Sequence, residues 1–132
     1  AEALDMAGVA VVKNAYRLYK ERGYRTKLLV AAFRNQHHWE EFIGGDIVLT
    51  ITSDWQHKYN GSDVVIQNNI DTPVADELLD ELMKLDEFKK AYFEEGLKPE
   101  AFEHYGAFLA TMNQFLGGYD DLVRLIRSYM IK

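Results

Sequence analysis

The sequence predicts an α/β fold in which a short parallel sheet is carried by a mostly helical chain. Residues 28–33 form a continuous apolar run, which is typical of a strand that is buried on both faces. A short helical segment follows, with Trp39, Phe42 and Ile43 at helical spacing, and the Gly44-Gly45 pair ends it. A second apolar run spans residues 47–51. Strand, helix and strand in this order form a βαβ unit, which makes the strands parallel with a right-handed crossover.

An amphipathic helix is expected over residues 4–22, before the first strand. Its apolar positions recur three or four residues apart, and Gly23 can adopt the left-handed conformation that ends a helix. Lys13, Arg17 and Lys20 lie off this apolar stripe. After the second strand, Thr52 or Ser53 can cap a short helix that reaches Tyr59.

The chain from Thr72 onward is predicted to be all-helical. Thr72 is a good N-cap for a first helix with Pro73 at its first position. A second helix is expected over residues 86–95, and Pro99 is expected to open a third. The Gly117-Gly118 pair is predicted to break the third helix and to leave a last helix over residues 119–131.

Length and composition restrict the class of protein. A chain of 132 residues forms one domain at most, and 48% hydrophobic residues supply enough side chains for a core. With no cysteine, neither disulfides nor thiolate metal sites can form, so a cytoplasmic location is the default expectation. Residues 61–132 carry seven Lys/Arg against fourteen Asp/Glu, which argues against nucleic acid or anionic lipid as a partner. No apolar stretch approaches the roughly 18 residues that a membrane span needs.

Two parallel strands are too few to form a stable sheet, because both outer edges need neighbours. Those neighbours are expected either from another part of a longer chain or from another copy of this chain, so a homo-oligomer is expected. The sequence begins at Ala1 without a methionine, and we expect it to be a piece of a longer protein.

The residues best suited to bind a ligand directly follow the first strand. A guanidinium at Arg34 can make a bidentate pair with phosphate or carboxylate, and the carboxyl ends of barrel strands are frequent phosphate sites. The alternative is a structural ion pair between Arg34 and a carboxylate such as Glu41. Asn35 can donate to the same ligand, or it can cap the following helix.

Other catalytic or cofactor sites are not expected. His37, His38 and Glu41 have spacings that metal ligands use, but only one of the two histidines can share a face closely with Glu41. A third ligand is not evident nearby, so a solvated helix face is expected and no metal. None of the lysines is a credible Schiff-base nucleophile, because that role needs a desolvated pocket at the ligand face. The sequence contains no Gly-rich phosphate loop, and no cofactor is expected.

Three segments in order resemble the transaldolase family. They are the helix end and turn Y-R-L-Y-K-E-R-G-Y-R-T (residues 16–26), the strand end A-A-F-R-N (31–35), and the strand G-G-D-I-V-L-T-I (44–51). The family has a Tyr-Tyr-Lys-containing helix, a G-Y-x-T turn, an A-S-F-R-N strand end and a G-C-D-x-L-T-I-x-P strand in this order. The match covers residues 8–53 well, and the helical tail agrees in general character.

This resemblance implies the carboxyl-terminal part of a TIM (β/α)8 barrel, with its last two parallel strands and its closing helices. Residues 1–132 would then be one partial domain, with the last βα units at 4–60 and the carboxyl-terminal helical segment at 72–132. Transaldolases transfer a dihydroxyacetone unit between sugar phosphates through a lysine Schiff base, within the pentose phosphate pathway. The family's catalytic lysine and acid/base carboxylates lie on earlier strands and would precede Ala1.

The site residues implied by the resemblance are few. Arg34 stands at the position of the family's phosphate-binding arginine, Asn35 and Phe33 complete the motif, and Ala32 and Thr50 lie near the site. Ala32 replaces a serine whose hydroxyl helps to hold the phosphate. Further departures are Gly45 in place of cysteine, one extra residue between Asp46 and Leu49, and Ser53 in place of proline. The predicted function is thus a phosphate-binding fragment of a transaldolase-like enzyme, with a non-catalytic, self-associating module as the alternative.

Overall fold

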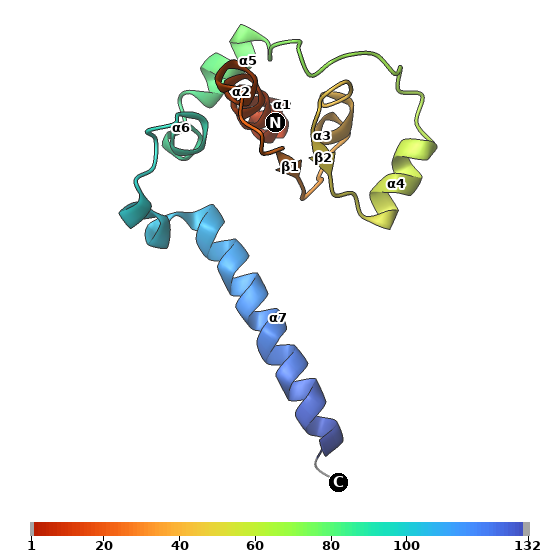
Figure 1. The fold of residues 1–132 in the computed structure, drawn as a ribbon, viewed down its shortest axis with the longest axis vertical. Helices are drawn as coiled ribbons and strands as arrows, with labels where there is room; N and C mark the ends of the chain where they lie inside the picture. Colours follow the sequence, from red (N-terminus) through yellow and green to blue (C-terminus); the bar gives the residue numbers. More distant parts are fainter. Residues whose placement is uncertain (1, 131–132) are drawn as a thin grey trace. The chain divides into compact units, whose positions relative to one another are not determined.

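The computed structural model describes residues 2–130 as a mostly helical α/β chain with two parallel strands. Two compact units are distinguished, residues 1–93 and residues 94–132, and each is described by itself. The first unit holds helices α1 to α6 and both strands, and the second holds a 3-10 helix and a long helix (Figure 1). The elements are α1 (Glu2–Asp5), α2 (Ala7–Arg22), β1 (Leu29–Val30), α3 (His37–Glu40), β2 (Val48–Leu49), α4 (Ser53–Asn60), α5 (Asp76–Leu82), α6 (Asp86–Tyr92), η1 (Pro99–His104) and α7 (Gly106–Met130).

Helix α2 is the centre of the first unit. Val9 and Ala10 are buried, and the helix ends as predicted at Gly23, whose φ of 62° is the left-handed value that glycine adopts most readily. The predicted single helix over residues 4–22 is interrupted at Met6, whose buried side chain packs with Phe42 and Ile70. Lys13 lies off the apolar stripe and is nevertheless buried, with 8% of its side chain exposed.

Two apolar clusters pack against the two sides of α1 and α2. One joins these helices to α5 and α6 through Ala3, Ala10, Leu82 and Phe88. The other joins them to the sheet and the segment after α3, through Met6, Val9, Phe42 and Ile70. Burying such side chains stabilises the fold by about 1.5–3 kcal/mol for each large one.

The two strands are parallel, as predicted. Leu29 pairs with Val48 and Val30 with Leu49, and the Thr50 amide donates to the Val30 carbonyl at 2.9 Å. The ladder is shorter than the predicted runs, because Ala32 has a φ of 63° and turns the backbone out of the extended conformation.

The two faces of the sheet differ, so the expectation of burial on both faces is wrong for the chain that the structure describes. Val30 and Leu49 pack towards the core that contains α2. Their neighbours Leu29 and Val48 point to the other face and are 63% and 48% exposed. The described residues therefore present a two-residue apolar patch on the face opposite α2.

Helix boundaries after residue 72 differ from the predicted ones. Helix α5 begins at Asp76 and not at Pro73, because residues 69–72 form a turn closed by the Thr72 amide on the Asn69 carbonyl. Helix α6 ends at Tyr92 instead of residue 95, whereas Pro99 does open η1.

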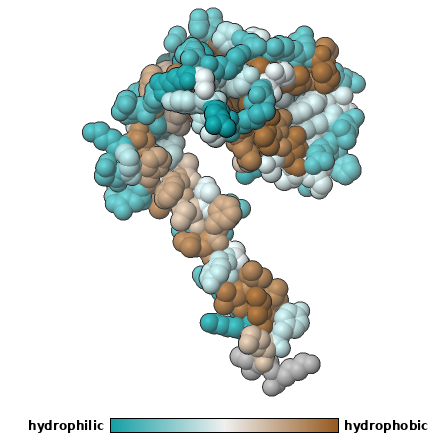
Figure 2. Space-filling model, viewed as in Figure 1, coloured by the Kyte–Doolittle hydropathy of each residue, from teal (hydrophilic) through white to brown (hydrophobic). Residues whose placement is uncertain are grey.

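In the second unit, the predicted break at Gly117-Gly118 is wrong, and α7 runs unbroken from Gly106 to Met130. Glycine weakens a helix by only about 1 kcal/mol per residue, so two glycines reduce helix stability without preventing the helix. Large apolar side chains are exposed along the length of α7 (Figure 2). Within residues 2–130, no helix combines the length and the apolar character that a membrane span requires.

Candidate functional site

The candidate site is the loop that leaves the carboxyl end of β1, residues 32–35, which we call the Arg34 loop. Its first residue, Ala32, is exposed and is the one described non-glycine residue with a positive φ. Phe33 follows and is 3% exposed, so the chain turns sharply from an exposed to a buried residue. The left-handed conformation at Ala32 and the burial of Phe33 together direct Arg34 away from the core.

Arg34 is exposed and has most of its donors available. Its Nη1 donates to the adjacent Phe33 carbonyl at 2.9 Å, and among residues 2–130 it forms no ion pair with a carboxylate. The alternative of a structural pair with Glu41 is wrong, because Glu41 pairs with Lys13. A guanidinium with free donors can receive an anion with two parallel hydrogen bonds.

Asn35 does cap the next helix, as one of the two predicted roles requires. Its Oδ1 accepts from the His38 amide at 3.2 Å, in the first turn of α3. Its Nδ2 donates to the Asp5 carbonyl at 3.1 Å, which ties the loop to α1. Its Nδ2 also lies 3.5 Å from His38 Nε2, so Asn35 has a structural role between α1 and α3.

His38 lies within the site and not on a solvated helix face, contrary to expectation. Its Nδ1 accepts from the Arg34 amide at 3.2 Å, and its ring packs edge-to-face on Phe33 with centroids 6.4 Å apart. Burial lowers the pKa of His38 below 6.5, more than its hydrogen bond with the Asp5 backbone raises it. The ring is therefore uncharged at pH 7.

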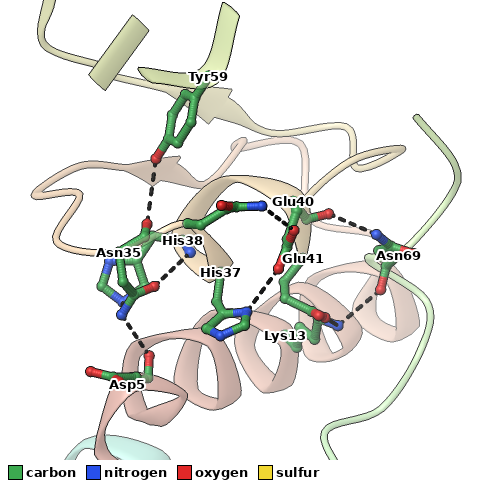
Figure 3. Close-up of polar contacts among 10 residues, drawn as sticks. Asp5, Lys13, Asn35, His37, His38, Glu40, Glu41, Tyr59 and Asn69 are labelled. Carbon is green, nitrogen blue, oxygen red and sulfur yellow. Dashed lines mark hydrogen bonds and ion pairs between the residues drawn. The ribbon is translucent and has the colours of Figure 1, made fainter. Parts of the chain in front are cut away.

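Tyr59 contacts the same loop from α4, and the sequence offered no signal for this contact. Its hydroxyl donates to the Asn35 carbonyl at 3.5 Å (Figure 3). Its ring stacks on Trp39 with centroids 4.4 Å apart and lies edge-to-face with Phe33 at 6.1 Å. Burial raises the pKa of Tyr59 to about 12, so the phenol stays protonated and able to donate.

Thr50 lies at the same edge of the sheet as the Arg34 loop, to which Ala32 belongs, because parallel strands end together. Thr50 is exposed and contributes its backbone to the strand ladder. Within residues 2–130 its hydroxyl has no hydrogen bond with the loop, so its predicted place near the site rests on strand direction alone.

A second polar cluster lies on α3, beside the loop. One ligand atom each from His37, Glu40 and Glu41 lies within 4.8 Å of the others, so Glu40 is the third group that the sequence interpretation missed. Lys13 Nζ lies 2.5 Å from Glu41 Oε2, however, and its positive charge opposes a second cation there (Figure 3). His37 Nδ1 is also in contact with Glu40 Oε1 at 2.8 Å. The expectation of no metal stays a prediction.

Comparison with known proteins identifies the family. The model of the transaldolase/fructose-6-phosphate aldolase family matches residues 2–109, which is most of the chain. No curated protein and no solved structure matches the chain significantly. The match includes β1, the Arg34 loop, α3 and β2 in one continuous segment. The chain therefore belongs to the transaldolase/fructose-6-phosphate aldolase family, whose function is aldolase-type carbohydrate chemistry.

Proposed function

We propose that this chain supplies the phosphate-binding part of a transaldolase-type enzyme. The enzyme would transfer a dihydroxyacetone unit between sugar phosphates through a lysine Schiff base. In this proposal Arg34 binds the substrate phosphate, with Asn35 Nδ2 as a second donor, and the catalytic lysine belongs to a part of the barrel outside these residues.

The observation that carries the proposal is the state of Arg34. Its side chain is exposed at the carboxyl end of a parallel strand and has no carboxylate partner within residues 2–130. Ligands of α/β folds bind at this end of the strands, and arginine suits the planar, bidentate recognition of phosphate. The neighbouring side chains of His38 and Tyr59 are both uncharged at pH 7, so neither competes with a phosphate for the positive charge of Arg34.

We further propose that the two strands belong to a (β/α)8 barrel as its last pair. Barrel strands alternate between side chains that face the outer helices and side chains that face the interior. Val30 and Leu49 pack on the α2 side, and Leu29 and Val48 point to the opposite, exposed face. In a closed barrel this second pair would fill the interior, where branched apolar residues are typical.

Lys13 is a buried lysine in a protein of an aldolase family, and aldolase-type catalysis can use a lysine as nucleophile. Its Nζ donates to Glu41 Oε2, to the Asn69 carbonyl at 2.9 Å and to the Thr72 carbonyl at 2.7 Å. A Schiff-base lysine must present its nitrogen to a substrate carbonyl, and this nitrogen is enclosed by three acceptors. Lys13 is therefore assigned a structural role.

The experiment is a titration of the isotopically labelled chain with inorganic phosphate, followed by NMR. Backbone amides of the Arg34 loop are expected to shift in the wild type, and Arg34→Met is expected to abolish these shifts. Arg124→Met is the matched control, because Arg124 is an exposed arginine in the other unit, paired with Asp121. Shifts that persist in Arg34→Met would contradict the assignment of Arg34.

A second proposed function is self-association without catalysis, which the exposed apolar pair Leu29 and Val48 favours. Another copy would cover this face or extend the open edge of a strand. Light scattering at micromolar concentration tests this proposal, with Leu29→Lys as the variant that should weaken association. A wild-type chain that is strictly monomeric would rule it out.

A further inference from the structure

We propose that His38 is a positioning residue for phosphate binding: its Nδ1 accepts the hydrogen bond of the Arg34 amide and so holds the Arg34 loop in the shape that presents the guanidinium. This inference rests on the proposed phosphate-binding function and assigns a role to a residue outside the A-A-F-R-N motif. His38 touches the loop and would not itself touch the ligand.

The loop needs such support because its own backbone is strained. Ala32 has a φ of 63°, and a left-handed conformation costs a residue other than glycine about 1–2 kcal/mol. Neither Ala32 nor Arg34 belongs to a helix or to the strand ladder, so neither is held by regular secondary structure. Contacts from outside the loop must therefore keep this conformation in preference to others.

His38 supplies two such contacts from one residue of α3. Its Nδ1 accepts from the Arg34 amide at 3.2 Å, and its own amide donates to Asn35 Oδ1 at 3.2 Å. These two hydrogen bonds hold consecutive residues of the loop, and His38 accepts in one and donates in the other. In Figure 3, His38 lies close beside Asn35, with a dashed line between the two residues.

The imidazole is itself held in place on two sides. Phe33 packs against it edge-to-face, and Gly8 of α2 lies so close that an added Cβ would be 3.5 Å from Nε2. The loop, α2 and α3 are thereby joined through one ring. A Cβ at position 8 would be in ordinary van der Waals contact with the ring, so α2 lies directly beside it.

Nδ1 can accept a hydrogen bond only while it carries no proton, so the neutral tautomer with hydrogen on Nε2 is required. The surroundings favour the neutral ring. Burial is the largest influence on the pKa of His38 and lowers it, and the positive charge of Arg34 and the neighbouring His37 lower it further. The Asp5 backbone and carboxylate act in the opposite direction and are weaker in sum.

The first test measures phosphate affinity at pH 7.5, where the ring is uncharged and the variants leave net charge unchanged. Inorganic phosphate and fructose 6-phosphate are titrated into the wild type, His38→Ala and His38→Asn. The Oδ1 of asparagine can take the place of Nδ1 as acceptor. His38→Ala is expected to weaken binding about threefold to tenfold, as loss of one net hydrogen bond implies, and His38→Asn to retain most of the affinity.

His57 provides the matched control, because it is an exposed histidine on α4, and His57→Ala is expected to bind phosphate like the wild type. Two results would overturn the proposal. One is His38→Ala with wild-type affinity, and the other is His38→Asn as weak as His38→Ala, since the acceptor would then be irrelevant.

A second measurement needs no ligand and separates this inference from the proposed function. The Arg34 amide resonance of the wild type is followed from pH 8 to pH 5 together with the His38 ring signals. Both are expected to move with the same midpoint below 6.5. An Arg34 amide signal that does not shift with the titration of His38 would overturn the positioning role, even if phosphate binds. If the two signals do shift together but phosphate does not bind, only the proposed function is overturned.

Discussion

The ammonium of Lys13 lies 2.5 Å from Glu41 Oε2, and the two residues form a salt bridge between α2 and the end of α3 with side chains 8% and 25% exposed. Two backbone carbonyls, of Asn69 and Thr72, accept the remaining hydrogen bonds of the same ammonium. One lysine therefore holds three separate parts of the chain together. This arrangement also removes Glu41 from competition for Arg34.

Replacing Lys13 by methionine should destabilise the fold by about 3 kcal/mol, because it leaves a partly buried carboxylate and two carbonyls without a donor. Urea unfolding followed by circular dichroism measures the change. The control is Arg17→Met, which breaks an exposed pair with Glu21 and should cost about 1 kcal/mol or less. Equal costs for the two variants would show that the Lys13 contacts contribute no more than a surface pair.

Replacing Ala32 by glycine should stabilise the fold by about 0.5–1 kcal/mol. Glycine removes the strain of the left-handed φ of 63°, and this gain exceeds the extra entropy that glycine gives the unfolded chain. Ala91→Gly is the matched control, since Ala91 is an exposed residue inside α6. This variant should be destabilised by about 1 kcal/mol. Destabilisation of both variants would mean that Ala32 is not strained.

Stability should decrease as the pH falls below about 6.5. The pKa of His38 is lower in the folded chain than in the unfolded chain, so the unfolded chain binds the extra proton first. The stabilising contribution is therefore complete above pH 6.5 and is lost as the pH falls towards the folded pKa. The lowered pKa values of Asp71 and Asp86 act only at lower pH, below their usual value of 3.8.

The check is the urea midpoint between pH 5 and pH 7.5 in the wild type and in His38→Asn. The wild type should lose stability over this range more steeply than the variant, because only the wild type has the titrating ring. Parallel curves for the two proteins would contradict the assignment of the pH effect to His38.

The chain should not form a Schiff base by itself. The one lysine buried among residues 2–130, Lys13, is enclosed by three acceptors. Borohydride treatment with fructose 6-phosphate, followed by intact mass, is therefore expected to leave the mass of the chain unchanged. A stoichiometric adduct on any lysine of this chain would show that the catalytic nucleophile lies here.

Local patterns were enough to predict the parallel pair of strands, the end of α2 at Gly23 and the family. Each depends on residues that are close in sequence, such as the two apolar runs around α3. The burial of Lys13 depends on acceptors at Glu41, Asn69 and Thr72, which lie 28 to 59 residues away. The periodicity of α2 places Lys13 off the apolar stripe and cannot reveal those partners.

The shape of the Arg34 loop was unpredictable for a similar reason. A left-handed residue is usually glycine, and Ala32 gives no such signal. The conformation is kept by His38 of α3 and Tyr59 of α4, which reach the loop only after these helices have packed. In α7 the local signal was misleading in another way. The helix continues through Gly117 and Gly118, because the helical segments on both sides outweigh the cost of two glycines.

The most direct test of the central claim compares fructose 6-phosphate with fructose by calorimetry, in the wild type and in Arg34→Met. The account predicts that the wild type binds the phosphorylated sugar and not fructose, and that Arg34→Met loses the difference between them. Equal binding of both sugars, or full retention of fructose 6-phosphate affinity in Arg34→Met, would contradict phosphate recognition by Arg34.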